Sequence, residues 1–257
     1  MTVYTLATAE QLLDWAKHFD PKVKSMAFRG QSDCNWRLTP SLARYFKAKD
    51  VPSDEWRSRE LKMYALFRNR LRSICHELYD DCEPLDILAM MQHHGIPTRL
   101  IDFTYSPMVA AYFALTAATA DCIVWMVDPK FLRDTRQASS APDYCGPSHS
   151  PQYTEAQKHH DIASIMTPRR HNARSAAQYG CFLVPGRISP HIPDGLIHGY
   201  ATISEDIVRE SLTKLKGLGI DRESLFPDLE AIAQETLRFA VTGRSRYAEA
   251  TVAEPLT

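Results

Sequence analysis

The stretch that decides the fold is Gln92-His-His-Gly-Ile-Pro-Thr-Arg-Leu-Ile-Asp-Phe-Thr-Tyr-Ser-Pro-Met-Val-Ala-Ala-Tyr-Phe-Ala114. Its apolar spacing predicts a helix from Pro84 to a stop at Gly95, followed by a strand over 98–103. Ser106-Pro107 then has the N-cap and first-turn chemistry that starts a second helix. Histidine, arginine, aspartate and hydroxyl side chains lie between these apolar elements. Such groups are costly to bury unless they pair or bind a ligand, so we expect the chemistry of the protein here.

The composition is that of an ordinary globular protein. The chain has 257 residues, 44% hydrophobic and 24% charged, with a formal net charge of −1. This balance argues against a protein that coats nucleic acid, which would be basic. Six scattered cysteines without a C-x-x-C pair predict reduced thiols in a cytoplasmic protein, and the N-terminus lacks the features of a signal peptide. The apolar run Met108–Val127 contains Asp121, which predicts a buried helix and a buried strand instead of a membrane span.

Outside the opening stretch, helix and strand signals alternate within one domain over residues 1–240. We predict further helices over 8–18, 53–78, 107–119, 204–215 and 225–240, and extended segments over 23–30, 36–42, 122–127 and 178–184. Residues 131–175 lose periodicity, which predicts a long surface excursion of the kind that covers a site. Residues 241–257 predict a frayed tail.

Three groups of motifs resemble the FRG domain, a family named for its Phe-Arg-Gly motif. They are Phe28-Arg29-Gly30-Gln31, then Thr39-Pro-Ser-Leu42 with Arg44, then the stretch from Gln92 to Thr104 with Ser106-Pro107 and Ala110-x-Tyr-Phe-Ala114. Asn172-x-Arg174, Gln178-Tyr-Gly-x-Phe182 and Leu225-Phe-Pro-Asp228 complete the resemblance, which covers roughly residues 8–240. The family is found in bacterial and phage-associated proteins, and its name alone implies no reaction.

A second resemblance implies an activity. The order of Phe28-Arg29-Gly30, then Phe103-Thr-Tyr-Ser106, then a helix, then a late strand is similar to that of Arg–Ser–Glu class ADP-ribosyltransferases. It implies an α+β single domain with a mixed, split β-sheet core wrapped by helices. It also implies that NAD is the substrate, with ADP-ribose passed to a protein, a nucleic acid or water. The setting implied is a toxin or anti-phage defence effector with a neutralising partner and no membrane association.

The same resemblance implies roles for individual residues. Arg29 would hold the diphosphate, since a guanidinium is a planar fork for phosphates, and Gly30 would let the backbone approach the ligand. Thr104 and Ser106 alternate onto one strand face, where both hydroxyls would meet the nicotinamide ribose, with Phe113 behind them. Gln178 stands where these enzymes carry Glu and would orient the ribose. Asp102 and Glu155 are both candidates for the missing negative charge. Side chains that would support these contacts from behind, without touching the ligand, are Gln92, His93, His94, Arg99, Asp102 and Arg174.

Structural explanations compete with these roles. Arg29 has Asp33 and Asp102 as candidate ion-pair partners, and we expect Arg99 and Asp102 to form a structural pair. Gln178 and Arg174 have an equally good explanation as residues that join one strand to its neighbour.

The remaining polar signals are weaker. One of His93 and His94 is expected to be a hydrogen-bonding scaffold residue, and we predict no metal site because no second cluster has ligand spacing. The basic residues of the 53–78 helix alternate with Glu55, Glu60 and Glu77, which indicates a solvated face.

Two other functions remain open. The first is a non-enzymatic module that senses a nucleotide or nucleic acid in the same groove, which the absent glutamate favours. The second is a metal-dependent nuclease or hydrolase that uses His93, His94 and Asp102.

Overall fold

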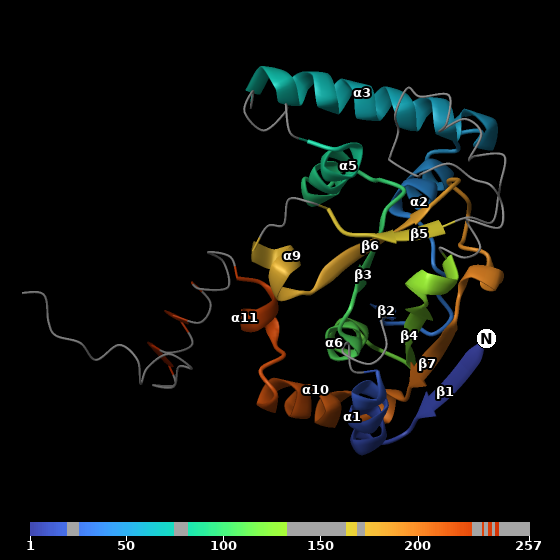
Figure 1. The fold of residues 1–257 in the computed structure, drawn as a ribbon. Helices are drawn as coiled ribbons and strands as arrows, with labels where there is room; N and C mark the ends of the chain where they lie inside the picture. Colours follow the sequence, from blue (N-terminus) through green and yellow to red (C-terminus); the bar gives the residue numbers. More distant parts are fainter. Residues whose placement is uncertain are drawn as a thin grey trace, which may run out of the picture.

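The computed structural model describes residues 1–19, 26–74, 82–132, 163–168 and 173–227, with 233, 236–237 and 240–241. Seven strands form one open sheet in the order β1-β7-β4-β2-β3-β6-β5 (Figure 1). The strands are β1 (Thr2–Leu6), β2 (Ala27–Gln31), β3 (Ile101–Thr104), β4 (Cys122–Val127), β5 (Ala163–Met166), β6 (Gly180–Pro185) and β7 (Gly199–Ile203). β1 and β7 are parallel and the other neighbours are antiparallel. The predicted mixed sheet with helices is therefore confirmed.

Helices cover the sheet in two groups. They are α1 (Ala9–His18), α2 (Ser41–Ala48), α3 (Trp56–Ile74), α5 (Pro84–His93), α6 (Pro107–Thr116), α9 (Ala173–Ala177), α10 (Val208–Gly217) and α11 (Arg222–Leu225). Short 3-10 turns are η1 (Ser53–Glu55), η2 (Asp194–Leu196) and η3 (Glu205–Ile207). In Figure 1, α1, α6 and α10 lie beside the β1-β7-β4-β2 half, and α3 and α5 lie beside the β3-β6-β5 half.

The two halves of the sheet meet at a narrow junction. β2 and β4 share the register pairs Ala27–Val127 through Gln31–Ile123, whereas β2 and β3 are joined at the single pair Phe28–Thr104. The sheet is therefore one continuous open sheet, and the split core that the ADP-ribosyltransferase resemblance implied is not confirmed.

Helix α6 packs on the centre of the larger half. Ser106 is its N-cap and accepts from the Val109 amide at 3.3 Å, and Pro107 occupies the first turn. The helix is apolar nearly all round and is buried against β2 and β4. The prediction that Met108–Val127 is a buried helix followed by a buried strand is confirmed. Within the described part of the chain, no helix has the length and apolarity needed to span a bilayer.

Several sequence predictions need correction. Residues 36–42 were expected to be extended, but helix α2 begins at Ser41 with Pro40 at its N-cap. Strands β1, β5 and β7 were not predicted. The final helix was expected over 225–240; α11 ends at Leu225 and residues 226–227 are not helical, whereas the described residues 233, 236–237 and 240 are helical and the others lie outside the described part of the chain. Most of the 131–175 excursion and nearly all of the predicted tail lie outside the described residues.

Candidate functional site

The Arg29 side chain links β2 to β3 beside their single register pair. Its Nη1 donates to the Asp102 backbone carbonyl at 2.7 Å and lies 3.7 Å from the Asp102 carboxylate. The guanidinium thus satisfies a strand carbonyl where β2 and β3 diverge, and of the two expected partners it is Asp102 that pairs with it. The Arg29 side chain is 23% exposed and that of Asp102 is 66% exposed.

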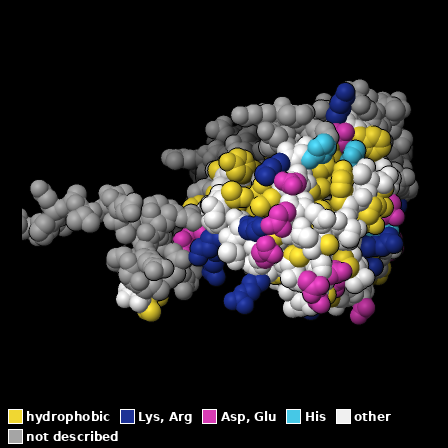
Figure 2. All heavy atoms as spheres, turned by 90° about the horizontal axis from the view of Figure 1, so that it is seen from below, with side chains coloured by type: hydrophobic (Ala, Val, Ile, Leu, Met, Phe, Trp, Pro, Cys, Tyr) yellow, Lys and Arg dark blue, Asp and Glu magenta, His cyan; other side chains and the backbone are white. Residues whose placement is uncertain are grey.

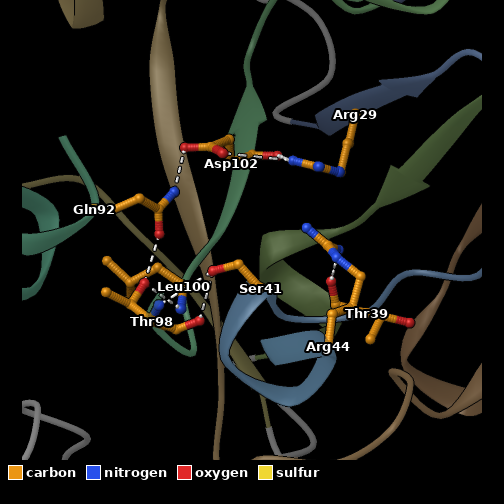
Figure 3. A network of polar contacts seen from close by, with 8 residues as sticks. All are labelled: Arg29, Thr39, Ser41, Arg44, Gln92, Thr98, Leu100 and Asp102. Carbon is orange, nitrogen blue, oxygen red and sulfur yellow. Dashed lines mark hydrogen bonds and ion pairs between the residues drawn. The ribbon is translucent and has the colours of Figure 1, made fainter. Parts of the chain in front are cut away.

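Arg44 on α2 brings a second guanidinium to the same place. Figure 3 shows the ends of Arg29 and Arg44 extending into one region beside Asp102. Burial lowers the pKa of Arg29; the charge of Asp102 opposes this shift and that of Arg44 adds to it. Arg44 donates to the Thr39 carbonyl at 2.7 Å. Among the described residues each guanidinium makes only one hydrogen bond, so most of their N–H donors are available to a ligand.

A chain of hydrogen bonds ties this site to the scaffold. Gln92 donates to the Asp102 carboxylate at 2.7 Å and accepts from the Thr98 hydroxyl at 2.5 Å. The Ser41 hydroxyl in turn both donates to the Thr98 carbonyl and accepts from its amide, each at 3.1 Å (Figure 3). The helix that ends near Gln92, the turn before β3 and the start of α2 are therefore fixed relative to one another.

The hydroxyls beside α6 are partly used by the fold. Thr104 donates to the Gln178 carbonyl at 2.7 Å and accepts from the Ser106 amide at 3.0 Å. The Ser106 hydroxyl accepts from Val109 as the helix cap, and its own proton has no acceptor among the described residues. Of the two predicted ribose contacts, Ser106 is thus the one with a donor to spare.

Gln178 joins β6 to the segment around α11. Its Nε2 donates to the Leu225 carbonyl at 2.9 Å, while its Oε1 accepts no hydrogen bond from the described residues. The Arg174 guanidinium lies 4.5 Å from the centre of the Phe226 ring, and Phe113 packs edge-on against the same ring. Phe113 and Arg174 therefore form part of the packing around the Leu225-Phe-Pro segment. Gln178 and Arg174 thus contact the segment at the end of α11, and these contacts do not join one strand to its neighbour.

A protein-family model, the FRG domain, matches residues 24–122. This chain contains an FRG domain. The match runs through the three motif groups that the hydrogen bonds above connect, from Arg29 through Ser41 and Arg44 to Asp102. No curated protein and no solved structure matches the chain. The sheet that holds the FRG match also includes β1, β5, β6, β7 and all but the first residue of β4 from outside it.

The glycine of the FRG motif is explained by packing. A Cβ at Gly30 would lie 1.9 Å from the Ala110 carbonyl oxygen and 2.6 Å from the Ala114 amide of α6. The space at Gly30 is thus filled by a helix backbone. Successive side chains of a strand point to opposite faces, so the Arg29 side chain lies on the face of β2 away from α6.

Arg99, within the FRG match, forms an ion pair with Glu60, which lies 39 positions earlier in the chain. Both Arg99 and Glu60 are buried; Arg99 Nε donates to one Glu60 oxygen at 2.7 Å and its Nη2 to the other. Nη1 also donates to the Gly186 carbonyl at 3.1 Å. The expected Arg99–Asp102 pair is therefore wrong, and Glu60 does not belong to a solvated face. This ion pair anchors α3 to the β3–β6 half.

The remaining predicted residues lie at the surface or in the core. His93 and His94 are exposed, with ring centres 5.2 Å apart. In the described part of the chain, no group of three His, Cys, Asp or Glu side chains is placed to hold a metal ion. Burial raises the pKa of Cys122 and of Cys181 to about 12, so these thiols stay protonated. Glu155 lies outside the described residues.

The surface seen in Figure 2 carries charges of both signs. Lys, Arg, Asp and Glu side chains are interspersed there, and an ion pair between Lys214 and Glu10 links α10 to α1. This face therefore offers no extended positive patch for a phosphate backbone.

Two residues have surroundings that the sequence did not reveal: Arg44, beside Arg29, and Glu60, the partner of Arg99. Arg44 stands in the quoted FRG motif, five residues after Thr39, and that was the one available signal. Glu60 had no such signal, because its partner is distant in the chain.

Proposed function

We propose that this protein binds NAD and cleaves its nicotinamide–ribose bond, passing ADP-ribose to a protein, a nucleic acid or water. The observation that carries the proposal is the pair of adjacent guanidiniums, Arg29 and Arg44, each with one hydrogen bond among the described residues. Two like charges repel, and the single Asp102 carboxylate beside them offsets only part of that repulsion, so a further anion would be favoured here. A diphosphate supplies that charge and accepts several guanidinium hydrogen bonds at once.

The shape of the sheet supports an ADP-ribosyltransferase-like arrangement. The ADP-ribosyltransferase resemblance implies a split sheet core, and in this continuous sheet the junction of β2 and β3 is limited to the Phe28–Thr104 pair. Arg29 is the next residue along β2 from that pair. The diphosphate would lie between Arg29 and Arg44, with the nicotinamide ribose toward Ser106 at the N-terminus of α6.

The proposed chemistry uses groups that have spare hydrogen-bonding capacity. Ser106 would donate its hydroxyl proton to the ribose, and Gln178 Oε1 would accept from a ribose hydroxyl. Departure of nicotinamide leaves an oxocarbenium-like centre, which negative charge stabilises. Asp102, largely exposed beside Arg29, is the nearest described carboxylate for that role.

The test is the release of nicotinamide from NAD, measured by chromatography with water alone, with mixed proteins and with nucleic acid as acceptors. Arg44→Gln should lower the rate at least tenfold, because a charge-assisted hydrogen bond contributes about 1.5–3 kcal/mol. Arg209→Gln, which removes an exposed arginine of α10, is the matched control and should leave the rate unchanged. The proposal is wrong if no acceptor supports release and NAD does not raise the melting temperature.

A specific observation favours a second candidate, a nucleotide-binding module without turnover. The Thr104 hydroxyl is used twice within the fold, and Gln178 is an amide where the resembling enzymes have a carboxylate. This candidate predicts a thermal shift with NAD or ADP that depends on Arg44, with no nicotinamide released.

A further inference from the structure

A row of side chains runs from the guanidinium site across the larger half of the sheet. Arg29 on β2 is the register partner of Trp125 on β4, and Trp125 is the register partner of Tyr200 on β7. Directly opposed residues of antiparallel strands point to the same face. Phe28 and Met126 alternate with them and belong to the core under α6. The row therefore lies on the sheet face that α6 does not cover.

The central ring of this row is held in place. Trp125 Nε1 donates to the Gln31 side-chain oxygen at 2.5 Å, and Gln31 is itself buried. The Tyr200 ring packs edge-on against the indole, with ring centres 5.5 Å apart and an interplanar angle of 63°. Both rings remain partly exposed. An aromatic ring that is fixed by its neighbours and still accessible is suited to stacking, because little conformational freedom is lost on binding.

The position of the row matches the layout of a nucleotide. A nucleotide joins its base to its phosphates through one ribose, and register partners on adjacent strands lie about 5 Å apart. A ligand whose phosphates contact Arg29 therefore has its base within reach of the next side chain in the row. Base stacking on an aromatic side chain is a general mode of nucleotide recognition.

We propose that Trp125, flanked by Tyr200, is the stacking surface for the adenine base of a nucleotide whose diphosphate lies between Arg29 and Arg44. This assignment rests on the proposed function for the position of the diphosphate. It goes beyond that function because it names the residues that distinguish a nucleotide from a bare phosphate ligand.

The test compares ADP with inorganic pyrophosphate, both measured by calorimetry on the full chain. Trp125→Leu should weaken ADP binding about 5- to 100-fold, the range that loss of one stacked base gives, and leave pyrophosphate binding unchanged. Trp125→Phe keeps a smaller ring and should lie between wild type and Trp125→Leu. Tyr4→Leu is the control, since Tyr4 packs against Trp15 on the α6 side of the same sheet.

The outcomes separate this inference from the function on which it rests. ADP affinity that depends on Trp125 without nicotinamide release supports the stacking site and removes the enzyme. Equal ADP affinity in wild type and Trp125→Leu removes the stacking site and leaves the diphosphate site in place. Parallel loss of ADP and pyrophosphate binding in Trp125→Leu and Trp125→Phe would make Trp125 a scaffold residue and overturn the inference. A wild-type protein that binds neither probe refutes both proposals.

Discussion

Replacing the motif glycine with alanine, Gly30→Ala, should destabilise the fold instead of blocking a ligand. The added Cβ would meet the Ala110 carbonyl oxygen at 1.9 Å and the Ala114 amide at 2.6 Å. Both atoms belong to the backbone of α6, which is buried against the sheet and cannot turn aside as a flexible side chain would. The helix must therefore move away from β2, or β2 must leave its register with β4.

The magnitude follows from the kind of contact. Overpacking of a core by one methyl group costs typically about 1–3 kcal/mol, when side chains can adjust. Here the obstacle is a helix backbone, so we expect a loss of about 3 kcal/mol or more. In a domain of this size each kcal/mol lowers the melting temperature by about 2–4 °C, which gives a fall of at least about 6 °C. That is a large share of the roughly 5–15 kcal/mol that stabilises ordinary domains.

Urea denaturation followed by circular dichroism measures this loss directly. Gly217→Ala is the matched control, because a Cβ there meets nothing within 4 Å at the last residue of α10. It should be neutral or stabilising by up to about 1 kcal/mol. The reasoning is refuted if Gly30→Ala costs less than about 0.5 kcal/mol. A variant that keeps full stability but no longer binds NAD would show that the glycine serves ligand approach, as the sequence first indicated.

Two further predictions concern stability away from the guanidinium pair. Glu60→Ala should lower the free energy of unfolding, measured by urea denaturation, by about 3–5 kcal/mol, because it leaves the buried Arg99 without its carboxylate. The double variant Glu60→Ala/Arg99→Met should recover part of that loss. A loss under about 1 kcal/mol in Glu60→Ala would contradict the importance of the pair. Tyr179 has a positive φ of 49° and is 65% exposed, so Tyr179→Gly should be neutral or stabilising by up to about 1 kcal/mol, whereas Tyr179→Val should destabilise. A clear loss of stability in Tyr179→Gly would mean that the ring, and not the backbone, matters at this position.

Local chemistry explains which elements could be predicted from the sequence. The Thr8–Gln11 capping box is present in both directions at the start of α1, and Ser106-Pro107 starts α6. Gly95 has a positive φ of 78° after the end of α5, as expected of a helix stop. These signals act within four residues, so a single sequence contains all the information that they need.

The missed elements depend on distant partners. β1 is an edge strand whose residues are mostly exposed, and it pairs in parallel with β7 from the other end of the chain. Neither strand shows a strong alternation of apolar residues, so only the pairing itself identifies them. Helix α2 was missed for a different reason: Pro40 suggested a turn, but it serves as the N-cap of a short helix whose Leu42 and Phe46 face the core.

The same distinction separates the predicted from the observed site. Arg29 and Asp102 could be paired because both stand in quoted motifs, although the contact to a backbone carbonyl could not be foreseen. Arg99 could not be matched with Glu60, since the pair joins a long helix to a turn across 39 positions of sequence. Sequence spacing identifies residues that are neighbours on one helix or strand. Arg99 and Glu60 lie on different elements, so spacing does not reveal their contact.

The structure changes how the FRG motif should be interpreted. Most of its polar side chains already have partners within the fold: Gln92, Thr98 and Ser41 hold one another, and the Asp102 carboxylate accepts from Gln92 and forms an ion pair with Arg29. A group whose hydrogen bonds are all made inside the protein has little left for a ligand. In this site, the described groups with donors or acceptors to spare include the two guanidiniums, the Ser106 proton, Gln178 Oε1 and the second oxygen of the Asp102 carboxylate. Arg29 alone does both kinds of work, closing the sheet with one N–H and presenting the rest. Replacing Arg29 would disturb the sheet and the proposed ligand contact together. Arg44 makes its single hydrogen bond to a loop carbonyl, so replacing Arg44 is the better test of the function of the site.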